Sequence, residues 1–315
     1  MKRNYKKSIK VFAPGTVSNV GCGFDTIGFA LNEPGEIVIV SLRNDDKIVI
    51  KKITGDNGTI PYNLKKNTAS VAVSSFLKKY NGRNIGVDIE IRKKMPTGGG
   101  LGSSAASAVA AVYGLNKLLG SPFKKNELLN FAMDGEAIAS GGIHADNVAP
   151  ALLGGITLIR DYNPIDIIKI PAPKNLYCIV LHSNVIVETK KARKLIKSEI
   201  SLKSARKHFG NMGTLIAGFY ESDFEKIGKA IEDEISEPAR SKLIPGFYDI
   251  KNAALNAGAY GCSISGSGPS IFAFSKTKKD AEVIGKAMGK VAHSHNLKTK
   301  TFISTVNNIG PKIIS

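Results

Sequence analysis

A glycine-rich loop between a predicted strand and a predicted helix limits the folds that this chain can adopt. The loop, Pro96-Thr97-Gly98-Gly99-Gly100-Leu101-Gly102-Ser103-Ser104, follows strand-like residues at 85–91 and opens an alanine-rich stretch that predicts a helix over 103–119. Its glycines let the backbone approach a ligand without a Cβ clash. Because the first N–H groups of a helix lack partners and lie at the positive end of its dipole, the junction predicts a phosphate site.

The loop fits none of the common phosphate motifs. No lysine follows its glycines as in a Walker A loop, and Ser103 stands where G-x-G-x-x-G needs its third glycine. No G-x-S-x-G segment occurs, which argues against an α/β-hydrolase. A glycine-rich turn that closes onto a tightly packed helix remains the explanation without a ligand. If phosphate binds, a hydroxyl from Ser103 or Ser104 could reach its magnesium ion.

The rest of the chain alternates between period-2 and period-3.6 patterns, which predicts an α+β fold with helices on one face of an antiparallel sheet. Predicted strands cover 8–13, 36–42, 47–53, 85–91, 156–159, 177–182, 271–274 and 300–305, with another near Cys262. Predicted helices cover 68–79, 103–119, 124–139, 188–196, 204–220, 223–234 and 278–292. Residues 161–174 contain three prolines and little periodicity, so we expect domains at 1–163 and 164–315.

Composition narrows the class of protein only modestly. The 315 residues, 43% of them hydrophobic, suffice for two domains with their own cores. No apolar run approaches the roughly 20 residues of a membrane span and the N-terminus lacks a signal-peptide core, so we expect a cytoplasmic protein without a membrane partner. Three cysteines without a C-x-x-C pair suggest neither a disulfide framework nor a zinc site. The net charge of +18 fits a nucleotide, a nucleic acid or simply a lysine-rich soluble surface.

Four segments resemble the GHMP kinase superfamily, and within it the homoserine kinases. The run Pro-x3-Gly-Leu-Gly-Ser-Ser-Ala-Ala at 96–106 is similar to the superfamily's ATP loop. Segments 13–25, 144–155 and 265–270 resemble homoserine kinases, and the four together span nearly the whole chain. The resemblance implies a two-domain GHMP kinase fold, with 1–163 like domain 2 of ribosomal protein S5 and 164–315 ferredoxin-like. It also implies ATP-dependent phosphorylation of the side-chain hydroxyl of L-homoserine to O-phospho-L-homoserine, in threonine biosynthesis.

The resemblance assigns the nucleotide site. ATP binding falls to Asn67 and to the loop Pro96, Thr97, Gly98, Gly99, Gly100, Leu101, Gly102, Ser103 and Ser104. Ser104 and Glu136 are implied as catalytic residues that hold Mg²⁺. Taken alone, Asn67 is explained nearly as well as a helix cap, and Glu136 as a solvated residue on a helix surface.

The substrate site is assigned in the same way. An amino acid offers a carboxylate, which suits an arginine fork, and an ammonium, which suits oxygen acceptors. Arg193 and Arg240 match the family's carboxylate ligands, and Asp25 suits the ammonium. The remaining implied contacts are Asn19, His144, Thr189 and Gly266. One departure is that Ser18, Asn19 and Cys22 stand where the family usually has Ala, Asn and Pro.

Asn147 stands where several GHMP kinases have a catalytic aspartate, as the resemblance implies for homoserine kinases. Asparagine is no general base, but phosphoryl transfer depends mainly on positioning and charge stabilisation. We therefore expect Asn147 to orient the hydroxyl while a phosphate oxygen or water accepts the proton. The adjacent Asp146 is the alternative base.

Two other functions stay open at this stage. A GHMP kinase acting on mevalonate or a sugar shares the loop, and mevalonate also carries a carboxylate for the two arginines. A non-enzymatic RNA-binding module would use the net charge of +18 and the S5-like half, although no basic stripe with interleaved aromatics supports it and we expect no nucleic-acid partner. The sequence leaves a homodimer open.

Overall fold

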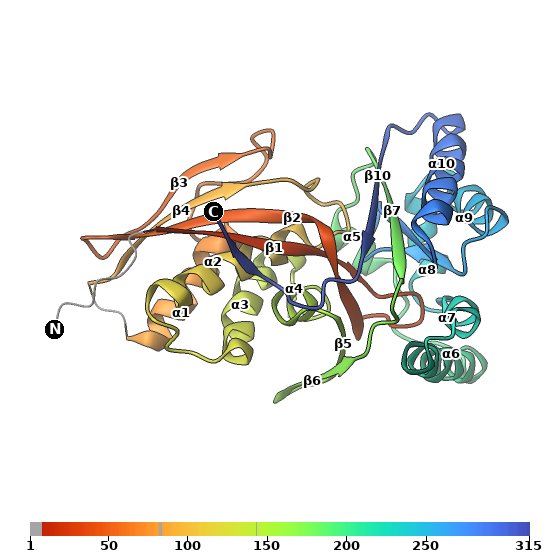
Figure 1. The fold of residues 1–315 in the computed structure, drawn as a ribbon, viewed down its shortest axis with the longest axis horizontal. Coiled ribbons are helices and arrows are strands. Elements are labelled where there is room, and N and C mark those ends of the chain that lie inside the picture. Colours follow the sequence, from red (N-terminus) through yellow and green to blue (C-terminus); the bar gives the residue numbers. More distant parts are fainter. Residues whose placement is uncertain (1–7, 82–83, 143) are drawn as a thin grey trace.

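Two lobes lie side by side in the computed structural model, which describes residues 8–81, 84–142 and 144–315 (Figure 1). The first lobe is a sheet with helices on one face, and the second is a smaller sheet with its own helices. Helices and strands thus form the α+β arrangement that the periodicities predicted. The long strands of the first lobe extend toward the second, and the C-terminal segment runs from the second lobe back to the first.

The sheet of the first lobe has seven strands within the described residues, in the order β11-β1-β2-β4-β3 with β5 on β2 and β6 on β5. Its strands are β1 (Ser8–Ser18), β2 (Ile27–Arg43), β3 (Ile48–Thr54), β4 (Gly86–Arg92), β5 (Ile156–Tyr162), β6 (Ile165–Ile170) and β11 (Lys312–Ile314). All pairs are antiparallel except β3 and β4, so the expectation of a fully antiparallel sheet is wrong at this edge. The helix between β3 and β4 supplies the crossover that a parallel pair requires.

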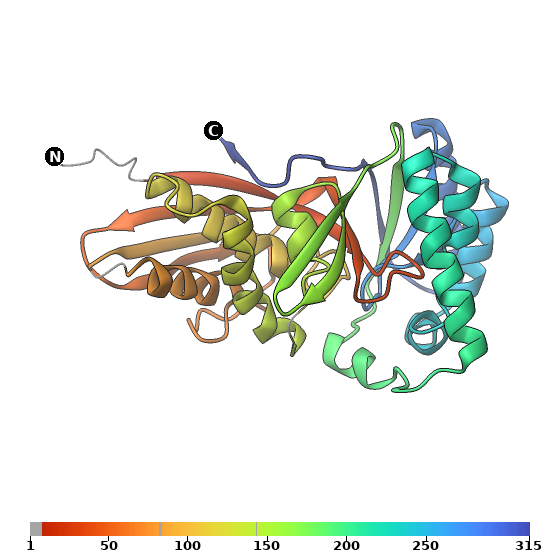
Figure 2. The same cartoon turned by 90° about the horizontal axis from the view of Figure 1, so that it is seen from below.

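The helices of the first lobe cover one face of this sheet (Figures 1 and 2). They are α1 (Thr68–Tyr80), α2 (Ser103–Leu118), α3 (Leu128–Ser140) and α4 (Val148–Leu153), with a 3₁₀ turn η1 at Lys125–Glu127. Helix α2 lies between the sheet and α1 and α3, and its alanines are buried, which permits the close packing that small side chains allow. The helix predicted at 124–139 begins later because Glu127 accepts a bond from Lys124 N (2.8 Å) and closes the 3₁₀ turn first.

The second lobe has a four-stranded sheet in the order β10-β7-β9-β8, counting strands of the described residues. Its strands are β7 (Tyr177–Ser183), β8 (Cys262–Ile264), β9 (Ile271–Ser275) and β10 (Thr299–Thr305). Its helices are α5 (Thr189–Lys194), α6 (Leu202–Glu221), α7 (Phe224–Ala230), α8 (Glu237–Arg240), η2 (Ser241–Leu243), α9 (Phe247–Asn256) and α10 (Lys278–Ser294). The helix predicted at 223–234 ends at Ala230, because Asp233 bonds the backbone N–H groups ahead of α8 instead.

Strand β7 joins the two lobes through its alternating side chains. Cys178 and Val180 lie in the core that includes the first lobe, whereas Ile179 and Leu181 lie in a second core with α9 and α10. Phe29 of β2 contacts Phe274 of β9 with ring centroids 5.6 Å apart. Each face of the second sheet is therefore buried against a different partner.

Several elements were not predicted: the first half of β2, together with β6, α4, α8, α9 and β11. Strand β6 lies in the proline-containing stretch 161–174 and pairs with β5, so the expected boundary at 163 falls in a β-hairpin turn. The division into 1–163 and 164–315 remains a prediction. Across the part of the chain that the structure describes, no helix combines the length and the apolar character needed to cross a membrane.

The approach of α3 to α1 generates a test of the packing. A Cβ added to Gly135 would lie 2.4 Å from Thr68 O, so Gly135→Ala should push the helices apart and lower the free energy of unfolding by about 1–3 kcal/mol. At Gly289 of α10 a Cβ meets nothing within 4 Å, and Gly289→Ala should be neutral or stabilising by up to about 1 kcal/mol. Urea unfolding of both variants checks this; equal effects would contradict the proposed packing.

Candidate active site

A cavity of about 590 Å³ brings most of the sequence-predicted site residues together. It is lined by the glycine loop, the end of β1, the start of α1, α5 and the turn between β8 and β9. The predicted residues among its lining are Asn19, Asp25, Asn67, Thr97, Gly98, Gly99, Gly100, Gly102, Ser103, Ser104, Glu136, His144, Asn147, Thr189, Arg193, Arg240 and Gly266. Two predicted loop residues do not line it, Pro96 and Leu101, and Leu101 is buried in the first core.

The glycine loop has a backbone that only glycine adopts easily. Gly98, Gly100 and Gly102 have φ of 65°, 70° and 62°. A Cβ on Gly102, the N-cap of α2, would lie 2.0 Å from Thr16 Oγ1. The glycines are therefore needed for the loop's own shape and packing as well as for ligand approach.

Hydroxyls from the second lobe hold this loop. Ser265 Oγ donates to Gly100 O and Ser270 Oγ donates to Gly99 O, while Thr16 N donates to Leu101 O at 3.0 Å. His182 Nδ1 lies 3.2 Å from Ser270 Oγ, and burial lowers the pKa of this imidazole. Because three successive loop carbonyls are bonded in this way, the loop conformation depends on both lobes.

Ser104 and Glu136 meet at the start of α2. Ser104 Oγ donates to Glu136 Oε1 at 2.9 Å, whereas Ser103 Oγ turns the other way and donates to Glu36 Oε1 at 2.8 Å. Burial raises the pKa of Glu136 to about 7, against the lowering effect of the Ser104 hydrogen bond. The two adjacent serines, equivalent in the sequence, thus have different partners.

The residues Ser104 and Glu136 suit a magnesium ion whose remaining ligands come from phosphate oxygens and water. Among residues 8–81, 84–142 and 144–315, no three His, Cys, Asp or Glu side chains are grouped to hold a metal ion. Mg²⁺ usually takes one or two protein carboxylates and completes its shell with phosphate oxygens and water. One carboxylate and one hydroxyl at the phosphate loop match that donor set.

Asn67 performs the capping role that the sequence offered as an alternative. Its Oδ1 accepts from Ala69 N at 3.1 Å and Ser70 N at 3.4 Å, and its Nδ2 donates to Pro61 O at 3.1 Å. The residue also lines the cavity. A contact to the nucleotide remains a prediction.

At the other end of the cavity, the segment after β1 places Asp25 against basic groups. Arg193 Nη1 donates to Asp25 Oδ1 at 2.7 Å, and His144 Nδ1 lies 4.0 Å from the same oxygen. Asn19, Val20 and Asp25 have φ of 72°, 39° and 57°, a conformation that side-chain-bearing residues rarely adopt. Cys22, which departs from the family pattern, is buried inside this segment, and burial raises its pKa to about 12.

Arg193 and Arg240 converge on Phe24, although they are far apart in the sequence. Their Cζ atoms lie 5.2 Å and 5.3 Å from the centre of the Phe24 ring. Arg240 Nη1 donates to Gly266 O at 2.9 Å, and Asn19 Nδ2 donates to the same oxygen at 3.0 Å. Two guanidinium groups on one aromatic ring form a site suited to a carboxylate.

Asn147 is held at both ends of its amide. Thr16 Oγ1 donates to Asn147 Oδ1 at 2.6 Å, and Asn147 Nδ2 donates to Ser18 Oγ at 3.0 Å. The neighbouring Asp146 is 5% exposed, and burial, followed by the charge of Asp25, raises its pKa. Asn147 therefore lies between the glycine loop and the carboxylate site in a fixed orientation.

Sequence reasoning missed several residues that shape this site. They are Thr16, Phe24, Glu36, Lys93, His182, Ser265, Ser267 and Ser270. Thr16, Phe24, Ser265, Ser267 and Ser270 lie inside segments already recognised, so the signal was their position in a motif. The sequence contains no signal for Glu36, Lys93 and His182, because their contacts are with residues that are distant in the sequence.

Comparison with known proteins places the chain in a family. Residues 67–155 match the model of the GHMP kinases N terminal domain, and residues 215–293 match that of the GHMP kinases C terminal domain. Homoserine kinases from Chlorobium phaeobacteroides strain BS1 and Chloroherpeton thalassium are 49% and 48% identical, each alignment covering 98% of this chain and 100% of the relative.

A solved structure agrees with these relatives. The crystal structure of homoserine kinase from Cytophaga hutchinsonii has a TM-score of 0.95 and 50% identity, covering 100% of this chain and 99% of that one. The two-domain GHMP kinase fold expected from the four motifs is thereby confirmed. The chain belongs to the homoserine kinases of the GHMP kinase family.

Proposed function

We propose that this protein transfers the γ-phosphoryl group of ATP to the side-chain hydroxyl of L-homoserine, giving O-phospho-L-homoserine and ADP. The observation that carries the proposal is one cavity with a glycine loop at one end and the Arg193, Arg240 and Asp25 cluster at the other. A kinase of this family uses ATP, and its relatives over the full chain are homoserine kinases. We propose the cytosol as its compartment.

At the nucleotide end, the loop amides and the start of α2 would bind the phosphates. Ser104 and Glu136 would hold Mg²⁺, which supplies positive charge to the phosphoryl group being transferred. Glu136 is 7% exposed, so its carboxylate lies largely out of water and its attraction for a cation is little screened.

At the acceptor end, Arg240 and Arg193 would bind the carboxylate of homoserine and Asp25 its ammonium. The Arg193–Asp25 ion pair holds both groups ready at 2.7 Å, and Thr189 Oγ1 lies 3.2 Å from Ser267 Oγ at the same wall. Asn147 would then orient the substrate hydroxyl, since Thr16 and Ser18 fix its amide. A phosphate oxygen or water takes the proton, because a loose transition state needs little help from a base.

The alternatives carry less support. A mevalonate or sugar acceptor shares the fold, but the full-length relatives at 48–49% identity are homoserine kinases. An RNA-binding module would need tight, steeply salt-dependent RNA binding, which a titration at two salt concentrations measures.

The direct test is a substrate panel. The purified chain with ATP and Mg²⁺ should release ADP fastest with L-homoserine, and mass spectrometry should identify phosphohomoserine. Mevalonate and galactose serve as competing acceptors, and a Glu136→Gln variant controls for contaminating kinases. Product formation no greater than in that variant, or a preference for another acceptor, would refute the proposal.

Carboxylate recognition by Arg240 can be tested separately. Arg240→Lys keeps the charge but loses the planar fork, so KM for homoserine should rise about 10–100-fold, the loss of one charged hydrogen bond. The KM for ATP should change little. Phosphorylation of 3-aminopropan-1-ol, which lacks the carboxylate, should be insensitive to the change, and the exposed Arg206→Lys is the matched control. Equal losses for both acceptors would show that Arg240 does not bind the carboxylate.

The base-free chemistry predicts a mild phenotype at Asp146. Asp146→Asn keeps the side-chain shape, so kcat should fall by less than about tenfold, whereas loss of a general base costs about 10²–10⁴-fold. Steady-state kinetics separate kcat from KM for homoserine, which can change if Asp146 helps bind the acceptor. A fall in kcat beyond a hundredfold in a natively folded variant would make Asp146 the base.

A further inference from the structure

A buried ion pair lies directly beneath the first turn of α2. Glu36, in the middle of β2, is 0% exposed, and Lys93, just after β4, is 6% exposed. Lys93 Nζ lies 3.0 Å from Glu36 Oε1. Neither residue has a role in the proposed phosphoryl transfer.

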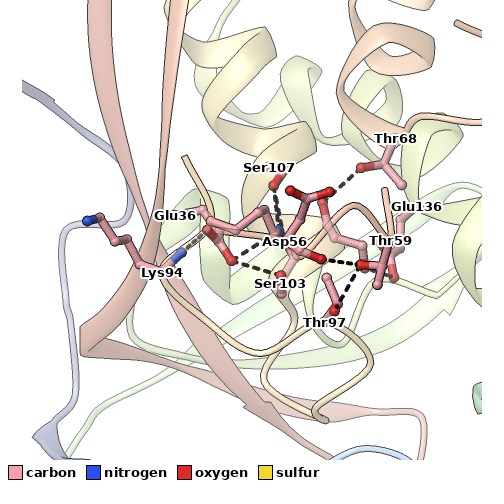
Figure 3. A network of polar contacts seen from close by, with 11 residues as sticks. Glu36, Asp56, Thr59, Thr68, Lys94, Thr97, Ser103, Ser107 and Glu136 are labelled. Atoms are coloured by element: carbon pink, nitrogen blue, oxygen red, sulfur yellow. Dashed lines mark hydrogen bonds and ion pairs between the residues drawn. The ribbon is translucent and has the colours of Figure 1, made fainter. Parts of the chain in front are cut away.

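Both members of the pair bond to Ser103 of α2, and Figure 3 shows Glu36 beside Ser103. Glu36 Oε1 accepts from Ser103 Oγ at 2.8 Å, while Lys93 Nζ donates to Ser103 O at 3.0 Å and to Ser107 Oγ at 3.0 Å. Glu36 Oε2 accepts from Lys94 N at 2.8 Å, which ties the carboxylate to the end of β4. Both charges therefore have several hydrogen-bond partners in addition to each other.

Stability alone is a weak reason to bury such a pair. Desolvation of two charges offsets much of their attraction, and replacing a buried pair by uncharged side chains of similar volume is often neutral for folding. The partners of this pair are Ser103 and Ser107, in the first two turns of α2, and Ser103 lies between the left-handed Gly102 and Ser104. A displacement of Ser103 would move the Ser104 hydroxyl, which lies 2.9 Å from Glu136 Oε1.

We propose that Glu36 and Lys93 are positioning residues for the phosphate and metal site. They fix the first turn of α2, so that the loop amides and Ser104 keep the geometry that MgATP requires. Of the acceptor groups, Arg193 and Arg240 lie on α5 and α8, and Asp25 lies in the segment between β1 and β2. None is on α2, so the pair should affect nucleotide binding and leave acceptor binding intact. The inference rests on the proposed function for the identity of the nucleotide.

The experiment separates positioning from stability with a double variant. Lys93→Met or Glu36→Gln alone leaves one buried charge without its partner and should lower the urea midpoint of unfolding. Glu36→Gln with Lys93→Met removes both charges and should restore most of that midpoint. If the pair positions α2, the double variant should still bind a non-hydrolysable MgATP analogue about tenfold more weakly, the equivalent of about one lost hydrogen bond.

Calorimetry of homoserine binding to the same variants provides the second measurement. Its Kd should stay at the wild-type value, so that the loss is confined to the nucleotide. A matched control is Glu237→Gln with Lys251→Met, which removes an ion pair (2.6 Å) of the second lobe between the buried Glu237 and the half-buried Lys251. It should leave binding of the MgATP analogue unchanged. If the Glu36 and Lys93 double variant does not fold, Ser107→Ala is the second variant, because it removes one hydrogen-bond partner of Lys93 without changing a charge. It should weaken the binding of the MgATP analogue and leave the binding of homoserine unchanged.

Two results would overturn the inference. In the first, the folded double variant binds the MgATP analogue as tightly as the wild type does. In the second, the binding of the analogue and the binding of homoserine weaken equally. Failure of the proposed function has a different signature. A wild-type protein that does not bind homoserine, but whose analogue binding responds to the double variant, would remove the acceptor assignment and retain the role of the pair.

Discussion

The docking of the turn between β8 and β9 onto the glycine loop is the interaction on which the site depends. Ser265 and Ser270 donate to the carbonyls of Gly100 and Gly99, across separations of 165 and 171 residues. In the same turn, Gly266 O accepts bonds from Asn19 and Arg240. A few backbone groups thus connect the predicted phosphate site with the predicted carboxylate site, and without this contact each half would hold only part of the cavity.

The charged side chains at each end of the cavity are opposite in sign to the charged groups of the ligand proposed for that end. The acceptor end combines Arg193 and Arg240 with Asp25 and the buried Asp146, which suits a ligand carrying both a carboxylate and an ammonium. The nucleotide end has Glu136 beside a hydroxyl, which suits a cation shared with phosphate. Because most of the charged groups that line the cavity are paired or partly withdrawn from water, they act locally, and the overall charge of +18 explains little about the site.

The segment between β1 and β2, where the first lobe reaches the second, contains three left-handed residues that are not glycine. Val20, a β-branched residue, has a φ of 39°, and Asn19 and Asp25 are also left-handed. The surrounding contacts compensate for this strain: Cys22 is fully buried, and a Cβ on Gly21 would lie 2.9 Å from Ile231 Cα of the second lobe. The unusual conformation brings Asn19 to Gly266 and Asp25 to Arg193 at once.

The sequence by itself determined the helices, strands and motifs that depend on residues close together along the chain. Periodicity predicted most of the longer helices and strands, and four motifs identified the family, the glycine loop and the residue types of both ends of the cavity. Short elements such as α4, α8 and β11 escaped because a few residues carry too little periodicity, and β6 escaped because the prolines on either side of it suggested a domain boundary.

Only the tertiary structure decided which partners residues of the same type bind. It separated Ser103, bonded to Glu36, from Ser104, bonded to Glu136, and showed that Asn67 caps α1. It also brought Arg193 and Arg240 to one phenylalanine and set His182 beneath the loop. These relations join residues on different strands and helices, and a pattern along one chain cannot specify them, because side-chain partners are fixed by packing between elements after each has formed.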